Sequence, residues 1–481
     1  MKLPKQVANP GLAALIQGSG FPSLERFANA VNLRGWEMHG VKLSYDHVSV
    51  KRWLGGSVCQ NPDVVAAVLS DAWGITVPAT VVWPELRSGD GPTPAHLQPW
   101  ATARTLENLG ALIGCDMLTR REALAAAVSA ATGASFVDPI ARWLTVPVGG
   151  VDPSIGNGGR IGTADVKRIE QSTRYFAATD AEVGGGLSRE AAVGQLKYAV
   201  DLMQHGSYTA TVGNQLLAAV AGLAGMVGWM CHDSGMSGPA QRYLTYGLQA
   251  ARESTDPRAQ LLVVGILADM ARHMRWLGRP DTAVRLLDLA LNQLPQDRSR
   301  FNTVRAILSS QKAWALAYHG RGCVPEVENA LALSFDLYAQ ADDHDRLAAD
   351  PLNLAHVRPS IDASEAELLS TASCAYLVLA KYDRSLAGKA EDRTLQTLAR
   401  AGEGRGRNDV LNQIRLARVR FVAGEPEQAC DDGERAVALA TNTASVMVRV
   451  RLRELLADSE PYHALPRVND LRTEIQTVAA R

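Results

Sequence analysis

Apolar residues recur at helical spacing in four short segments near the start of the chain: 10–17, 23–31, 46–54 and 63–73. In the third segment, Val50, Trp53 and Leu54 stand at i, i+3 and i+4, which gives a helix one buried face. Asp46 can cap the start of this helix, and the two glycines after Leu54 can end it. The pattern predicts a small four-helix domain with a core that includes Phe27, Val31, Val50, Trp53 and Leu54.

The opposite face of the third predicted helix is short-chained or basic, and it carries His47, Ser49, Lys51 and Arg52. Lys42 precedes the helix, and residues 1–60 hold seven Lys or Arg against three Asp or Glu in a chain of net charge −1. Such side chains can reach base edges and phosphates. A basic and aromatic third helix is the layout of a helix-turn-helix domain, so these five residues are the candidate DNA contacts.

Within the predicted recognition helix, Arg52 can read a guanine through two parallel hydrogen bonds, whereas Lys51 is better suited to a phosphate. His47 lies near the helix N-terminus, where base edges are usually met. Many surface helices are amphipathic with a basic face, so a second interpretation stays open. In that interpretation the N-terminal helices form a structural cap on an interaction scaffold that touches no DNA.

Composition favours a large helical protein. The chain has 481 residues, of which 47% are hydrophobic and 6% aromatic, and this length exceeds one compact core. The near-zero net charge argues against wholesale coating of nucleic acid, so any DNA contact is local. Residues 1–11 lack the apolar core of a signal peptide, and the uncharged run 216–231 is predicted to be a buried helix. We therefore expect a cytoplasmic protein that does not enter the membrane.

Proline and glycine divide the chain into segments of different character. We interpret residues 1–76 as the helix-turn-helix domain, 77–96 as a linker, 97–135 as a helical connector, 136–163 as a flexible linker and 164–481 as a repeat domain.

The repeat domain carries a tetratricopeptide-like pattern, in which a glycine turns the chain between two closely packed helices. The pattern requires a small residue seven positions before the glycine, Ala five positions after it, and a small and an aliphatic residue twelve and thirteen after it. Gly235, Gly278 and Gly424 meet every requirement, Gly320 meets some, and Tyr382 stands in a further partial match. Most successive turns are 42 or 43 residues apart. The pattern predicts an α-solenoid, so the fold class is all-α.

Motifs for catalysis or cofactor binding do not stand out in the sequence. There is no ordered Ser/His/Asp set, no HExxH motif and no P-loop, and the glycine-rich run 156–162 lacks a following Lys-Ser/Thr. The six cysteines are scattered, and the stretch 342–345 (Asp-Asp-His-Asp) lacks helical ligand spacing, so we interpret it as a solvated loop. We expect no enzymatic activity, no cofactor and no metal.

Several stretches resemble a known family: NPGLAALI (9–16), LERFANAVN (24–32), LSYDHVSVKRWLG (43–55), MLTRREAL (117–124), GLAGMVGWMCHDSG (222–235) and AQRY (240–243). Together they resemble actinobacterial transcriptional regulators that join an XRE-like helix-turn-helix to a tetratricopeptide domain. That group includes streptomycete negative regulators of development and antibiotic production. The resemblance runs over most of the chain and implies the same two-part all-α fold and a repressor of development or secondary metabolism.

We therefore expect a transcriptional regulator that binds double-stranded DNA. One short helix-turn-helix contacts too few bases for specific affinity, so a homodimer is expected. The solenoid is expected to bind a peptide, a protein or a small ligand, which would change the placement of two DNA-binding heads and so bias DNA affinity.

Overall fold

The computed structural model describes residues 8–19, 21–39, 43–73, 82–83, 101–117, 134–145, 150–156, 159–184, 188–294, 301–342, 364–400, 406–441, 443 and 445–479. All regular elements in these ranges are helices, apart from isolated β-bridges that pair Ser154 with Tyr208 and Arg160 with Ser207. The predicted all-α fold is confirmed. The chain divides into a small N-terminal domain and a solenoid-like body that holds almost all described residues from 101 onward.

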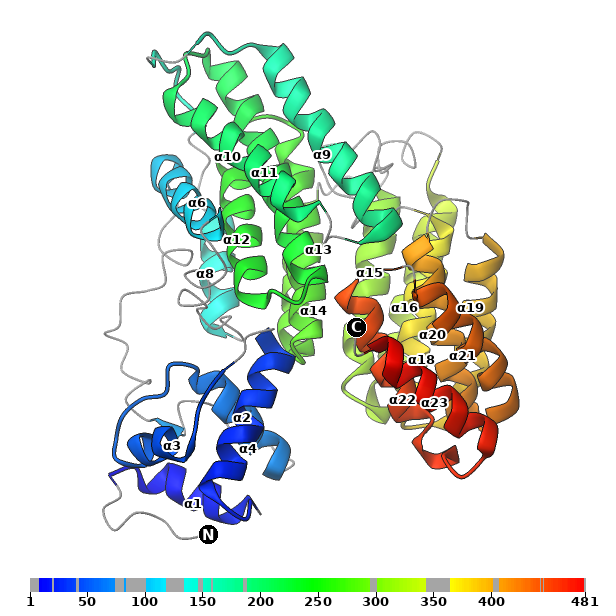
Figure 1. Cartoon of the computed structure of the whole chain (residues 1–481). Coiled ribbons are helices and arrows are strands. Elements are labelled where there is room, and N and C mark those ends of the chain that lie inside the picture. Colours follow the sequence, from blue (N-terminus) through cyan, green and yellow to red (C-terminus); the bar gives the residue numbers. More distant parts are fainter. Residues whose placement is uncertain are drawn as a thin grey trace. The chain divides into compact units, whose positions relative to one another are not determined.

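The N-terminal domain consists of α1 (Pro10–Gly18), α2 (Leu24–His39), α3 (His47–Leu54) and α4 (Pro62–Trp73) (Figure 1). These helices lie where the apolar pattern predicted them, except that α2 continues to His39 instead of ending near residue 31. Gly35 lies in this extension, and a Cβ at its buried position would lie 2.2 Å from Cδ1 of Leu43. Only a residue without a side chain lets Leu43 pack directly against the last turns of α2.

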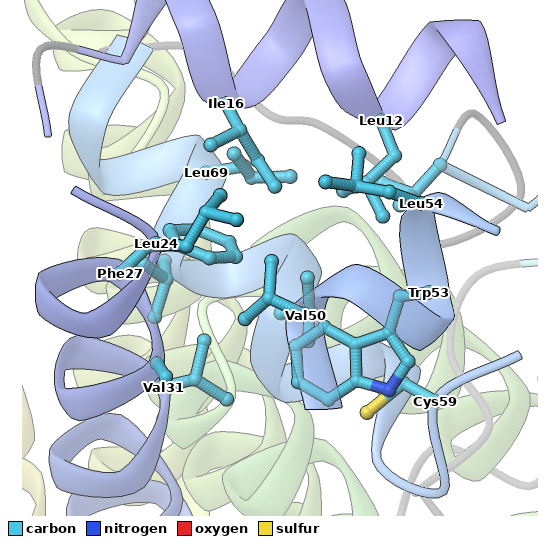
Figure 2. Packing of buried hydrophobic residues seen from close by; sticks show 14 of the residues in the cluster. Leu12, Ile16, Leu24, Phe27, Val31, Val50, Trp53, Leu54, Cys59 and Leu69 are labelled. Carbon is cyan, nitrogen blue, oxygen red and sulfur yellow. The ribbon is translucent and has the colours of Figure 1, made fainter. Parts of the chain in front are cut away.

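The core of this domain is shown in Figure 2. It includes all five residues predicted for it: Phe27, Val31, Val50 and Leu54 are fully buried, and Trp53 is 4% exposed. Leu12 and Ile16 of α1 and Leu69 of α4 fill the remaining space between the helices. Each helix therefore contributes its apolar face to one continuous core.

Two residues beyond α4 also belong to the N-terminal domain. Val82 and Trp83 lie in the segment interpreted as a linker, yet both are completely buried in the N-terminal core. The side chain of Asn9 donates from Nδ2 to the carbonyl oxygen of Val82 at 2.8 Å, and Nε1 of Trp83 donates to the carbonyl oxygen of Ser57 at 3.2 Å. After α4, the chain therefore comes back to the N-terminal core, where Val82 bonds to the residue before α1 and Trp83 bonds to the loop after α3.

The body is a succession of helices: α6 (Thr102–Met117), α8 (Ala134–Leu144), α9 (Thr163–Val183), α10 (Arg189–His205), α11 (Ala210–Asp233), α12 (Ser237–Glu253), α13 (Ala259–Trp276), α14 (Pro280–Gln293), α15 (Asn302–Ala317), α16 (Val324–Gln340), α18 (Glu365–Ala380), α19 (Ala387–Arg400), α20 (Gly406–Ala423), α21 (Pro426–Ala440), α22 (Val446–Asp458) and α23 (Pro466–Ala479). Short 3₁₀ helices at Arg321–Cys323, Arg384–Leu386 and Glu460–Tyr462 lie in three of the connections. From α13 onward the helices pack in consecutive pairs, and the first helices of neighbouring pairs also touch. This arrangement is that of a solenoid.

The predicted turn glycines all adopt the left-handed conformation that favours glycine. Gly235, Gly278, Gly320 and Gly424 have φ of 75°, 69°, 90° and 83°, and each lies in the connection between two successive helices. The small residues of the pattern allow close helix approach: a Cβ at Gly228 of α11 would lie 2.8 Å from Cγ of Leu244 in α12. The positions chosen from the sequence therefore act as turns and as close contacts.

Helix α8 occupies part of the segment interpreted as a flexible linker. Phe136, Ile140 and Leu144 recur at i, i+4 and i+8, and all three are buried. Pro139 lies inside the helix, where it removes one backbone donor. The apolar face packs against α14, and this burial outweighs the local cost of the proline.

Helix α11 is the apolar run predicted to be a buried helix. By length and composition it could span a membrane, but 78% of its apolar window is buried inside the body. It packs against α9, α10 and α13. The described part of the chain is therefore compatible with a soluble protein.

Candidate nucleic-acid interface

The entry to α3 is held by polar contacts to its neighbours. Asn32 of α2 clamps the backbone of Tyr45: its Nδ2 donates to the carbonyl oxygen at 2.7 Å, and its Oδ1 accepts from the N–H at 2.8 Å. Nδ2 of Asn61 donates to the hydroxyl of Tyr45 at 2.8 Å. Burial raises the pKa of Tyr45, and it raises the pKa of the neighbouring Cys59 thiol to about 11. Both groups are neutral at pH 7, so the contacts of Tyr45 that position the start of α3 involve no charged side chain.

Asp46 and Ser49 form a capping box at the start of α3. Oδ1 of Asp46 accepts from the N–H of Ser49 at 2.8 Å and from its hydroxyl at 2.9 Å. The backbone N–H bond, followed by the hydroxyl bond, lowers the pKa of Asp46. Ser49, a predicted DNA contact, therefore uses its hydroxyl hydrogen within the helix cap.

His47 is joined to α2 through Glu25. Oε2 of Glu25 accepts from the backbone N–H of His47 at 3.0 Å and lies 3.1 Å from its Nδ1. Both side chains are about half exposed, and the pair becomes an ion pair only when the imidazole is protonated. The N-terminus of α3 thus carries two carboxylates, those of Glu25 and Asp46, which suit the positive end of the helix dipole.

The C-terminal end of α3 is tied to the residues before α1. The carbonyl oxygen of Leu54 accepts from the N–H groups of Ala8 and Asn9, at 2.9 and 3.0 Å. The side chain of Asn9 also caps α1, because its Oδ1 accepts from the N–H of Leu12 at 2.9 Å. Together with its bond to Val82, Asn9 connects both ends of the domain to α3.

Lys51 and Arg52 are the exposed cations of α3. They lie in its last turn, while Val50, Trp53 and Leu54 on the opposite side are buried in the core. Neither side chain makes a hydrogen bond or an ion pair with any residue that the structure describes. Their charges suit the negative end of the helix dipole. Both side chains are therefore available to phosphates or base edges.

The five predicted contacts are thus placed differently. Lys51 and Arg52 are exposed side by side, His47 and Ser49 are engaged within the protein, and Lys42 lies outside the described residues. Sequence reasoning missed Glu25 and Asn9. An Asn directly before a proline at the start of a helix is a readable capping signal, whereas the contact between Glu25 and His47 depends on how α2 and α3 pack.

No group of three or more His, Cys, Asp or Glu within the described ranges is arranged to hold a metal ion. In the stretch 342–345, residues 343–345 lie outside those ranges, as do residues 157 and 158 of the glycine-rich run.

Comparison with known families gives one match, to a model described as the SP15 N-terminal domain, over residues 12–82. The matched span begins in α1 and ends at Val82, which is buried in the N-terminal core. The similarity therefore covers the N-terminal domain. No curated protein matches the chain at a significant level.

Proposed function

We propose that this protein is a sequence-specific DNA-binding transcriptional regulator whose repeat body binds a controlling ligand. The observation that carries the proposal is the division of α3 into two faces. Val50, Trp53 and Leu54 anchor the helix in the core, and Lys51 and Arg52 stand exposed on its last turn. A short helix that is rigidly supported and presents free cations is the element that helix-turn-helix proteins insert in the major groove.

The two cations have different proposed tasks. The planar guanidinium of Arg52 can donate two parallel hydrogen bonds to O6 and N7 of a guanine. The ammonium of Lys51 is a compact charge that suits a phosphate oxygen. Glu25 and Asp46 repel phosphates at the other end of α3, so the helix approaches DNA with its C-terminal turn closest to the backbone.

A single α3 of this length reads few base pairs, so the protein acts on DNA as a homodimer with two copies of α3 about one helical turn apart. The ligand of the repeat body, a peptide, a protein or a small molecule, alters how these two copies are presented. The resemblance to streptomycete regulators supports the more specific proposal of a cytoplasmic repressor of development or secondary metabolism.

The alternative is a scaffold for protein–protein interaction that binds no DNA. It is favoured by the contacts of His47 and Ser49, whose polar atoms bond to Glu25 and Asp46. Two of the five candidate contacts are therefore engaged within the protein, and the N-terminus of α3 is acidic. Direct measurement of DNA binding separates the two functions.

The experiment begins with the selection of bound sequences from a random duplex library by the full-length protein. Affinity for the selected duplex and for a scrambled one is then measured at several salt concentrations. The variants are Lys51→Ala, Arg52→Ala and Arg52→Lys. Lys197→Ala is the matched control, because it removes an exposed cation from α10 of the body, where Lys197 pairs with Asp201.

We expect Arg52→Ala to lose about 1–3 kcal/mol on the selected duplex and to relax the preference at one base pair. Arg52→Lys keeps the charge but loses the two-pronged contact, so it should retain the salt dependence and lose the preference. Lys51→Ala should weaken binding to both duplexes and reduce the salt slope by about one. If no duplex is enriched, or if all variants bind like Lys197→Ala, the scaffold function is correct.

A further inference from the structure

Arg275, near the end of α13, is a buried guanidinium that forms no ion pair with any residue that the structure describes. It is 9% exposed, and its Cζ lies 3.5 Å from the centre of the Trp314 ring of α15. Nη1 of Arg275 and Nε1 of Trp314 are both buried, and neither atom has a hydrogen-bond partner among the described residues. Two neighbouring donors in the interior of the body therefore lack an acceptor.

The other arginines around Arg275 are paired. Nη2 of Arg272 lies 2.6 Å from Oε1 of Glu367, and Nη1 of Arg451 lies 2.6 Å from Oε1 of Glu454. Each also faces an indole: Cζ of Arg272 lies 5.9 Å from the ring centre of Trp229, and that of Arg451 lies 5.6 Å from the ring centre of Trp276. Glu367 and Glu454 thus pair with Arg272 and Arg451, whereas Arg275 forms no ion pair with a described residue.

The surroundings of Arg275 disfavour its charge. Burial, with a smaller effect of the charges of Arg272 and Arg451, lowers the pKa of this guanidinium to about 9, although Tyr318 and Cys374 act in the opposite direction. The group is still protonated at pH 7. A stacked indole offsets only a small part of the cost of burying a charge without a hydrogen-bonded partner. Buried polar groups in folded proteins are almost always hydrogen-bonded, so these two donors call for an acceptor, and a bound ligand would supply one.

The missing partner must accept hydrogen bonds and carry negative charge. A compact oxyanion meets both conditions, because its oxygens can accept from the fork of a guanidinium and from an indole N–H together. Tyr318, at the end of α15, is 38% exposed, and the side chain of Arg451 is 23% exposed, so the edge of the cluster is open to solvent.

We propose that Arg275 and Trp314, with Arg272 and Arg451 beside them, bind a small ligand through its phosphate or carboxylate group. This assignment gives a chemical class to the ligand of the repeat body and so rests on that part of the proposed function. It selects, among the three kinds of ligand expected, a small molecule with an anionic head.

The test is calorimetric titration of the full-length protein with inorganic phosphate, pyrophosphate and succinate at constant ionic strength. Arg275→Gln removes the charge and most of the donors. Arg393→Gln is the matched control, since Arg393 of α19 also stacks on an aromatic ring, that of Phe335, but bonds to Gln396. Trp314→Phe keeps the aromatic face and removes only the indole N–H.

We expect one of the three anions to bind the wild type at a single site with a Kd below about 1 mM. The identity of that anion distinguishes a phosphate from a carboxylate ligand. Arg275→Gln should weaken binding at least about tenfold and Trp314→Phe by a smaller factor, while Arg393→Gln should bind like the wild type. No saturable binding of any of the three anions to the wild type would overturn the proposal.

Thermal unfolding without added anion separates a ligand site from a structural contact. Since Arg275 forms no ion pair within the described part of the chain, Arg275→Gln should unfold at the wild-type temperature or above it. It should also lose the stabilisation that the bound anion gives the wild type. A lower unfolding temperature of Arg275→Gln, with no effect of anions on the wild type, would show a structural role. DNA binding by the same variant is measured separately, so loss of the anion site and loss of DNA binding are distinguishable.

Discussion

Replacement of Trp53 by alanine is expected to remove a large part of the stability of the N-terminal domain. Trp53 is the largest side chain that α3 contributes to the core, and it is 4% exposed. Its ring meets Tyr45 edge to face at 4.9 Å and Trp83 at 6.4 Å between ring centres. These contacts join α3 to Tyr45, which precedes the helix, and to Trp83, which follows α4. One substitution therefore weakens the packing of three parts of the domain.

The size of the effect follows from the buried area. A buried tryptophan removes about 150–250 Å² from water, which at about 25 cal/mol per Å² corresponds to about 4–6 kcal/mol. Alanine keeps the Cβ, so we expect a loss of about 3–5 kcal/mol in the free energy of unfolding. A domain of this length has a total stability of about 5–13 kcal/mol. The variant therefore loses about a quarter of that stability or more.

The assay is urea unfolding of residues 1–94, followed by circular dichroism at 222 nm. Trp36→Ala is the matched control, because Trp36 of α2 is 57% exposed and its loss should change the free energy by about 0.5 kcal/mol or less. Equal unfolding midpoints for Trp53→Ala and Trp36→Ala would refute the assigned phase of α3, and with it the assignment of Lys51 and Arg52 to the outer face.

Three further predictions concern charge and assembly. Glu25→Gln should strengthen DNA binding at low salt, because the amide oxygen can still accept from the N–H of His47 while a charge that repels phosphates is removed; weaker binding would mean that the carboxylate itself is needed. Asp46→Ala should lower the unfolding temperature at pH 7, and Asp46→Asn should not, because Asn is also a good cap. The pKa of Asp46 is lowered in the folded state. The stabilising effect of its carboxylate is therefore complete above about pH 4 and is lost as the pH falls through the folded-state pKa. Identical acid unfolding curves for the wild type and the Asp46→Asn variant would contradict this. Light scattering should give the molecular mass of a dimer for the full-length protein in the presence of DNA. The mass of a monomer at micromolar concentration, both with and without DNA, would exclude a mechanism in which two copies of α3 bind one site.

The local features of this protein are determined by short stretches of its sequence. The apolar spacing of Val50, Trp53 and Leu54 predicted the buried face of α3, and Asp46 predicted its cap, because both depend on residues within one or two helical turns. The turn glycines could be predicted for the same reason. Gly278 and Gly424 have a positive φ, which glycine adopts most easily, so the requirement for glycine depends on the backbone at that one position.

What only the tertiary structure decided are the contacts between residues far apart in the chain. The burial of Trp83, the bond between Glu25 and His47, and the stacking of Arg275 on Trp314 each depend on how whole helices pack. Helical periodicity says which face of a helix is buried but not which neighbour it meets, and many partners satisfy an alanine- and leucine-rich face equally well. The tasks of polar residues follow from those neighbours. The four N-terminal helices could therefore be predicted from the sequence, whereas helix α8 and the engagement of His47 and Ser49 within the protein could not.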